Sequence, residues 1–352
     1  MDVLHPDIHA LLKDLSGCLN VTSRYLSKTS FLLNIPYCLE SLTWQLTFAK
    51  LGVRHACPDI LVPDTQFTPL IHSDRVQAAY LGASDLQQRG LTRLVKELLD
   101  SYSEYQQHVL DQLASPGTAL RFEADTVFGA TDVRTQVLCT QSQALFVVTP
   151  FSPVEWEQLH ASMRQLGITD AEQQRMQPDL RLRVGFPLSP AHARQSPAIR
   201  LHIPAKLESL AGRVELPSWP AGRMCILEYL PLVKDAVQAS MAQAVRVCTI
   251  RRDVFRELSS TGLGAPIELD TISYSTATFD LPSDRMPLLL LCDLPPSFPQ
   301  QKPRLTLQAG SNMPPKLVED YIWDPSWTAA DMAEHVHGAV DRAQLSLGFQ
   351  HD

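Results

Sequence analysis

Residues 288–299 read Leu288-Leu289-Leu290-Leu291-Cys292-Asp293-Leu294-Pro295-Pro296-Ser297-Phe298-Pro299. An unbroken apolar run that stops at a cluster of prolines is typical of a buried strand followed by a sharp turn. Pro303 then opens the alternating segment Leu305-Thr306-Leu307. Proline is tolerated directly before a strand because its missing N–H lies at the end of the hydrogen-bond ladder. The segment therefore predicts two antiparallel strands joined by a proline-rich turn.

The same arrangement occurs twice earlier in the chain, as a weak internal repeat. The apolar residues of the first copy are Leu42, Trp44, Leu46 and Phe48, followed after Pro58 by Ile60-Leu61-Val62. Those of the second copy are Leu182, Val184 and Phe186, followed after Pro187 and Pro197 by Ile199, Leu201 and Ile203. Alternation with a period of two is the pattern of a half-buried strand. We expect three antiparallel meanders.

Segments with helical periodicity surround these meanders. One runs over 6–17, a second over 91–110 and a third, long one over 231–258. A last helix is expected after Thr328, whose hydroxyl suits an N-cap. The segment 121–148 shows strand patterns with faint helices. The predicted fold class is α+β.

Loop chemistry divides the chain into three parts. Ala114-Ser115-Pro116-Gly117 and Ser218-Trp219-Pro220-Ala221-Gly222 place boundaries near residues 112 and 222. The predicted domains are 1–112, 113–222 and 223–352, the last with a long leading helix. Such sizes agree with roughly 100–200 residues per domain.

Composition excludes several classes of function. Apolar residues make up 45% and charged residues 19%, as in a folded protein. The net charge of −8 disfavours a nucleic-acid ligand unless basic residues are concentrated on one face. The densest basic spot in the central part, Arg251-Arg252, shares a helical pattern with Asp253 and Glu257. We interpret it as a solvated helix face.

Seven cysteines are scattered through the chain and form no C-x-x-C pair. They are Cys18, Cys38, Cys57, Cys139, Cys225, Cys248 and Cys292. Unpaired thiols are typical of a reducing compartment. No run approaches the ~20 apolar residues of a membrane span, and Met1-Asp2 does not begin a signal peptide. We expect an intracellular protein without a membrane segment.

A helix, an antiparallel meander and a proline-rich crossing resemble the front half of the ubiquitin-conjugating-enzyme fold and its RWD and UEV relatives. The segments 291–299 and 303–308 are similar to that family's strand-loop-strand signature. The resemblance implies tandem UEV/RWD-like domains.

Several separated segments, in the right order, are similar to the BRE (brain and reproductive organ-expressed protein) family. They are Ile35-Pro36-Tyr37, Leu42-Thr43-Trp44, Leu94-Val95-Lys96-Glu97-Leu98, Cys225-Ile226-Leu227-Glu228-Tyr229-Leu230-Pro231, the third copy and 321–327. The resemblance implies a scaffold subunit of BRISC/Abraxas-type deubiquitinase complexes. Its implied partners are an Abraxas-type MPN-minus subunit, a JAMM metalloprotease and a von Willebrand A-like adaptor, with ubiquitin as a further ligand to test. It also implies a place in nucleus and cytoplasm, in DNA-damage and immune signalling.

A working conjugating enzyme needs a thiolate after the proline strand and a His-Pro-Asn segment to stabilise the oxyanion. The windows 63–90, 204–222 and 308–352 contain no cysteine, and no His-Pro-Asn occurs. We therefore expect no catalytic residue, no cofactor and no metal. Cys38 and Cys57 are interpreted as core thiols.

Two further patterns suggest chemistry only at first sight. His335-Val336-His337 has two histidines flanking one residue, a pattern that occurs in JAMM metalloproteases, but Leu345 stands where that motif needs serine. Helical residues two apart also point about 200° apart, which favours surface histidines over a zinc site. Thr261-Gly262-Leu263-Gly264 follows a helix and lacks a P-loop lysine, so it predicts a turn.

The remaining functional surface is an interface. We expect the helix over 231–258 and the last meander to form one docking face, because its apolar stripe is broad. The candidate contact residues are Val233, Val237, Met241, Phe298, Trp323 and Trp327. The stripe could instead only cover the sheet, and Trp219, Trp323 and Trp327 could pack under loops.

Three other functions stay open at this point. The chain could be a stand-alone ubiquitin-binding UEV module. It could be an RWD-type ubiquitin-ligase subunit, although that class carries a RING with clustered Cys and His ligands, which this sequence lacks. An active conjugating enzyme is disfavoured by the missing cysteine.

Overall fold

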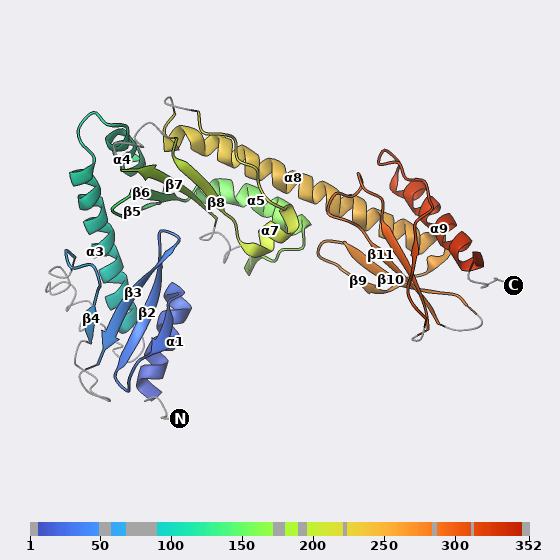
Figure 1. Ribbon diagram of the computed structural model, residues 1–352, viewed down its shortest axis with the longest axis horizontal. Coiled ribbons are helices and arrows are strands. Elements are labelled where there is room, and N and C mark those ends of the chain that lie inside the picture. The colour runs from blue at the N-terminus through green and yellow to red at the C-terminus, as the bar shows by residue number, and fades with distance from the viewer. Residues whose placement is uncertain are drawn as a thin grey trace. The chain divides into compact units, whose positions relative to one another are not determined.

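The computed structural model describes residues 6–48, 58–67, 90–171, 180–188, 196–220, 224–283, 287–310 and 313–346. The chain forms two compact units, each assembled from separate segments. The first comprises 1–152, 180–202 and 217–232, and the second 153–179, 203–216 and 233–352. Together the described residues build three antiparallel sheets with helices, which confirms the α+β class (Figure 1). The boundaries predicted near 112 and 222 stay predictions.

The first sheet contains the first copy of the repeat. Its strands follow the order β1-β2-β3-β4, namely β1 (Thr22–Tyr25), β2 (Ser30–Tyr37), β3 (Glu40–Thr47) and β4 (Asp59–Leu61). The helices α1 (Pro6–Leu19) and α3 (Gly90–Leu113) share a core with it, as their periodicity predicts. Trp44 and Leu98 are buried in this core.

The second sheet also belongs to the first unit. Its strands are β5 (Thr135–Cys139), β6 (Gln143–Val148), β7 (Arg181–Pro187) and β8 (Ala198–His202) in that order. The Tyr37 hydroxyl of the first sheet donates a 2.9 Å hydrogen bond to the Val137 carbonyl. Arg183 and Glu40 form an ion pair at 2.9 Å. These contacts join the two sheets of the unit.

The strands expected from residue 121 begin later than predicted. Helix α4 (Ala119–Gly129) occupies the start of that segment. The Thr118 side chain accepts a hydrogen bond from the Arg121 N–H, and Arg121 pairs with Asp125 one turn on at 2.8 Å. A cap and an i,i+4 ion pair stabilise a short helix whose apolar stripe is weak.

The long helix α8 (Ile226–Leu258) begins before the predicted start at Pro231. A Glu228 oxygen accepts the Cys225 N–H at 2.9 Å, the backward half of a capping box. The Ile226 N–H donates to Glu123 of α4, also at 2.9 Å. With its first donors satisfied by side chains, the helix can form ahead of the proline.

Glu123 is buried, and burial raises the pKa of its carboxyl from 4.5 to about 7, against the opposing hydrogen bond from Ile226. A raised pKa means that the folded state holds the proton more tightly than the unfolded state. The resulting stabilisation is complete below pH 4.5 and is lost as the pH rises through 7.

We expect Glu123→Gln to remove this pH dependence, because the amide oxygen still accepts the Ile226 N–H without a charge. Above pH 7 the variant should exceed the wild type in free energy of unfolding by up to about 3 kcal/mol. Urea unfolding between pH 4.5 and 8 measures this. Parallel pH curves for the two proteins would contradict the assignment.

The second unit holds the third copy of the repeat. Its sheet has the order β13-β12-β11-β10-β9. The strands are β9 (Pro266–Leu269), β10 (Thr276–Leu281), β11 (Leu288–Asp293), β12 (Arg304–Ala309) and β13 (Lys316–Val318). The strands expected at 288–292 and 305–307 are therefore confirmed.

Helices α8 and α9 (Ala329–Ser346) share one core with the inner face of this sheet. Phe255 of α8, Leu290 of β11 and Val336 of α9 are buried in it. After α8, the element η4 (Ser259–Leu263) leads into β9, with positive φ at Gly262 and Gly264. The glycine pair thus forms a turn, as predicted. The short helices α5 (Pro153–Gln165) and α7 (Ala205–Ala211) belong to the same unit.

Arg251 corrects the prediction of a solvated basic face. Its side chain is buried, at 7% exposure, and only Arg252 is exposed. The guanidinium donates to the Ser273 carbonyl at 3.2 Å and to the Pro295 carbonyl at 2.7 Å. Burial lowers the pKa of Arg251. The residue therefore ties α8 to the loops that flank β10 and β11.

We expect Arg251→Met to destabilise the second unit by about 3 kcal/mol, because two buried carbonyls lose charged donors. Arg252→Met on the same helix is the matched control and should change stability by less than about 0.5 kcal/mol. Hydrogen exchange of the β10 to β12 amides reports on this unit alone. Equal exchange in both variants would show that the two hydrogen bonds contribute nothing.

Candidate docking cleft

A cleft of about 460 Å³ lies on the second unit, and one wall of it is a single face of α8. Gln243, Arg246, Val247, Ile250 and Asp253 line this wall. Their spacing of three, four and seven residues places them on one side of a helix. Val247 and Ile250 are half-buried, whereas Gln243 and Arg246 are exposed. The wall is therefore apolar in the middle and polar toward its ends.

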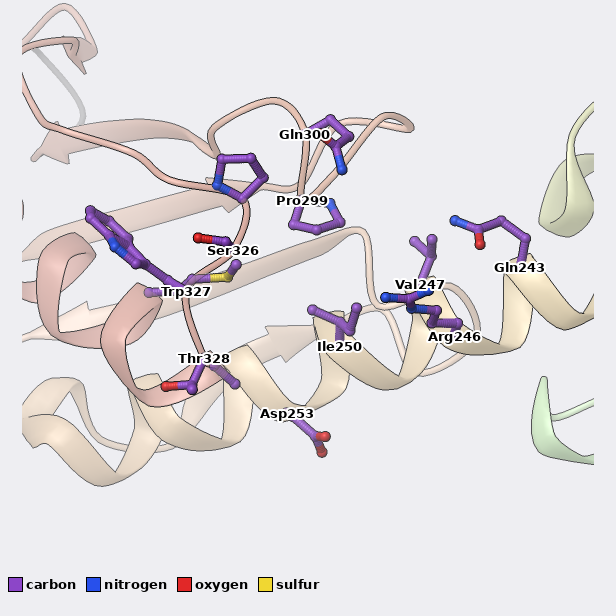
Figure 2. Close-up of a pocket in the computed structure, with 13 residues that line it drawn as sticks. Gln243, Arg246, Val247, Ile250, Asp253, Pro299, Gln300, Ser326, Trp327 and Thr328 are labelled. Carbon is purple, nitrogen blue, oxygen red and sulfur yellow. The ribbon is translucent and has the colours of Figure 1, made fainter.

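The opposite wall comes from two loops and the start of α9. Pro299 and Gln300 follow β11, residues 325–328 precede α9, and Ala329 and Met332 lie in its first turn. Figure 2 shows Pro299 and Gln300 across the opening from Val247 and Ile250 of α8. Segments far apart in the sequence thus meet at one site.

A row of aromatic rings supports this second wall. Phe298 and Trp323 have ring centroids 5.6 Å apart, and Trp323 and Trp327 are 6.1 Å apart. Trp327 stacks on the His335 ring at 3.8 Å. The Trp323 indole N–H donates to the Pro299 carbonyl at 2.8 Å, which fixes the turn after β11. The rings hold Trp327 at the edge of the cleft.

The start of α9 is fixed by a reciprocal cap. Thr328 Oγ1 accepts the Asp331 N–H at 3.2 Å, and an Asp331 carboxylate oxygen accepts the Thr328 N–H at 3.1 Å. The hydrogen bonds from Thr328 lower the pKa of Asp331. This arrangement is a capping box with aspartate in place of glutamate. It confirms Thr328 as the N-cap and positions the neighbouring Trp327.

The cleft carries one unmatched cation. Asp253 is shared between Arg252 at 3.7 Å and Arg256 at 3.5 Å. Within the described part of the chain, no ion pair involves Arg246. An exposed guanidinium beside apolar and aromatic side chains suits a partner that supplies a carboxylate or carbonyl oxygens.

The predicted contact residues fall into two groups. Phe298, Trp323 and Trp327 are brought together in the aromatic row, and Trp327 lines the cleft. The three candidates on α8 are buried within the chain itself, at 0–1% exposure, namely Val233, Val237 and Met241. Phe298 is also buried. Side chains buried this deeply offer no free surface, so their contact with a partner stays a prediction.

Arg246 and Ile250 are among the cleft residues that the sequence analysis does not predict. Their signal was present, because they share a helix face at a spacing of four residues. The apolar stripe on the core-facing side of α8 is stronger, and it predicts contact residues on that side of the helix instead. Trp219, which sequence alone left open, packs on Tyr229 at 4.9 Å between centroids.

The described thiols and histidines have local roles. Cys38 and Cys292 are buried, and burial raises the pKa of both thiols. Cys57 lies outside the described residues. His335 Nδ1 contacts the Asp331 carbonyl at 2.9 Å, whereas His337 Nδ1 pairs with Asp341 at 3.1 Å.

The two histidine rings therefore engage different partners. In the parts of the chain that are placed, no group of three His, Cys, Asp or Glu side chains could hold a metal ion. None of the placed helices is long and apolar enough to cross a bilayer.

We expect Thr328→Ala to lower the free energy of unfolding of the second unit by about 1 kcal/mol, because the first turn of α9 loses its cap. Thr328→Ser keeps the hydroxyl and should retain most of the stability. Hydrogen exchange at the amides of residues 330–334 distinguishes the two variants. Equal protection in both would mean that the backbone alone fixes this helix start.

Comparison with known proteins gives two kinds of match. A family profile described as "Brain and reproductive organ-expressed protein (BRE)" matches residues 11–313. A protein of Danio rerio called "BRISC and BRCA1-A complex member 2" is 24% identical over 343 residues, covering 91% of this chain and 86% of its own length. A Branchiostoma floridae protein with the same description is 26% identical over 144 residues, covering 38% of this chain and 37% of its own.

Proposed function

Because the chain belongs to the brain and reproductive organ-expressed protein (BRE) family, we propose that it is a non-catalytic subunit of a deubiquitinase complex of the BRISC or BRCA1-A kind. The near full-length match to a relative described as a member of both complexes carries this proposal. The docking cleft and its half-buried aromatic rings support the proposal physically, because such features are suited to binding other proteins.

The second element of the proposal is that the meanders are UEV/RWD-like domains without enzymatic activity. Each of the three described sheets is antiparallel and contains one copy of the proline-ended repeat. The windows in which a conjugating enzyme carries its nucleophile contain no cysteine. Buried thiols with raised pKa, such as Cys38 and Cys292, are poor nucleophiles at neutral pH. We accordingly assign no catalytic residue.

The third element concerns partners and location. We propose that the chain bridges an Abraxas-type MPN-minus subunit, with its JAMM metalloprotease, and a von Willebrand A-like adaptor. By bridging these subunits, the chain supports the removal of ubiquitin chains in DNA-damage signalling. We propose that it does so in the nucleus and the cytoplasm. A stand-alone ubiquitin-binding UEV module or an RWD-type ligase subunit is the alternative. Neither alternative accounts for the complex membership in the description of the relative.

We place one of these contacts at the docking cleft between α8 and the start of α9. Arg246 supplies an unmatched positive charge, Ile250 an apolar floor and Trp327 a ring at the edge. An aromatic and an arginine in one partly desolvated site are the residue types that dominate binding energy at interfaces. A partner segment therefore needs a carboxylate to pair with Arg246 and, beside it, an apolar side chain to pack against Ile250 and Trp327.

We expect Arg246→Glu combined with Trp327→Ala to abolish comigration with at least one partner. The test is coexpression with the Abraxas-type subunit and the von Willebrand A-like adaptor, followed by size-exclusion chromatography. The charge reversal opposes the partner carboxylate, and the truncation removes the aromatic contact.

The matched control is Arg252→Glu, which makes the same charge change six residues along α8 and outside the cleft lining. It should comigrate like the wild type. If the wild-type protein comigrates with neither partner, the result contradicts the scaffold proposal and favours the ubiquitin-binding alternative. If the double variant and the control both comigrate with the partners, the scaffold role stands and only the proposed contact at the cleft is excluded.

A further inference from the structure

Strand β11 has apolar residues on both faces, although only one face is covered. Its inner side chains, including Leu290 and Cys292, lie in the core with α8 and α9. Its outer positions are Leu289, which is half-buried, and Leu291, which is 44% exposed. In an antiparallel sheet with one solvated face, the outer positions are normally polar.

The same chain shows what a covered strand looks like. β6 carries the apolar run Ala144–Val148, and every one of these residues is buried. β11 has an equally apolar run, Leu288–Cys292, but its two outer positions are not buried: Leu289 is half-buried and Leu291 is exposed. An unbroken apolar strand is the pattern of a sheet covered on both sides. No described segment of the chain therefore buries the outer face of β11.

The strand register extends this apolar feature across the sheet. Leu291 lies opposite Thr306 of β12, and Thr306 lies opposite Leu317 of the edge strand β13. Directly opposed residues point to the same face. Leu317 is 39% exposed. Leu289, Leu291 and Leu317 together form what we call the outer leucine patch.

The charges around the outer leucine patch are mainly acidic. Asp280 lies opposite Leu289, and Glu268 lies opposite Thr278, the cross-strand neighbour of Leu291. Both acids are exposed, and in the described parts of the chain neither forms an ion pair. Asp293 also faces outward, and the basic Arg304 lies directly opposite it in the register. The patch is thus bordered by two unmatched negative charges.

We propose that the outer leucine patch binds a protein surface whose aliphatic side chains are flanked by lysine or arginine. The leucines supply the apolar contact, and Asp280 and Glu268 select for the basic flank. This surface consists of strand residues and shares none with the docking cleft, so it is a second and independent binding face. The acidic border disfavours nucleic acid and anionic lipid, which are repelled by it.

The test uses the full chain and a fluorescein-labelled helical peptide of about 18 residues, built from leucine on one face and lysine on the other. Fluorescence anisotropy at physiological ionic strength measures the Kd. We expect the double variant Leu291→Ser, Leu317→Ser to weaken binding about tenfold. Glu268→Gln with Asp280→Asn should weaken it by about fivefold.

The control variant is Leu61→Ser with Leu345→Ser, which removes two exposed leucines from other elements and should bind like the wild type. Hydrogen exchange of wild-type residues 288–293 gives a second readout that needs no variant, and the peptide should protect them. Equal binding by the leucine variant, or equal binding of a leucine–glutamate peptide, would overturn the proposal. So would a wild-type dimer in sedimentation that Leu291→Ser dissociates, because a second copy would then be the cover.

Discussion

The second unit depends on a buried guanidinium, that of Arg251, which forms no ion pair within 4.0 Å among the described residues. Arg251 reaches from α8 to the carbonyls of Ser273, which precedes β10, and Pro295, which follows β11, at the same end of this antiparallel strand pair. The first carbonyl is itself held in place, because Asp270 accepts hydrogen bonds from the backbone and side chains of the loop that contains it. Those hydrogen bonds lower the pKa of Asp270. The ordered dipoles of the two carbonyls stabilise the positive charge of the buried guanidinium.

This arrangement explains why a cleft exists beside α8. A charge-assisted pair of hydrogen bonds fixes the rotation of the helix about its axis, so Val254 and Phe255 point into the core. The face with Arg246 and Ile250 is then left opposite the loop that carries Pro299. The Trp323 indole holds that same loop from the other side. Both walls are consequently positioned by hydrogen bonds to main-chain carbonyls.

Local patterns in the sequence were sufficient for most elements, because alternation and helical periodicity are local. The strands around Trp44, Val184 and Leu290 and the helix from Gly90 could be predicted for that reason. Arg251 could not, because its carbonyl partners lie 22 and 44 residues away and the adjacent Arg252 suggested a solvated face. The early start of α8 was missed for a related reason, since Glu123 caps it from 103 residues away.

The candidate site was predictable in part. The sequence predicts Phe298, Trp323 and Trp327 as contact residues, and the three rings do form one aromatic row. The apolar stripe of α8 was misleading about exposure, since periodicity identifies a face but cannot say whether the chain itself or a partner covers it. Val237 and Met241 prove to be covered within the chain. Arg246 becomes notable only when its lack of an ion pair is visible.

The continuity of α8 also bears on how this chain can evolve. Residues 226–232 of the helix group with the first unit and the remainder with the second. Recombination that exchanged either unit for a homologous module would cut the continuous hydrogen-bonded ladder of this helix. The two halves are thus constrained to be inherited as a pair, and new architectures in this lineage should arise by elaborating loops rather than by shuffling modules.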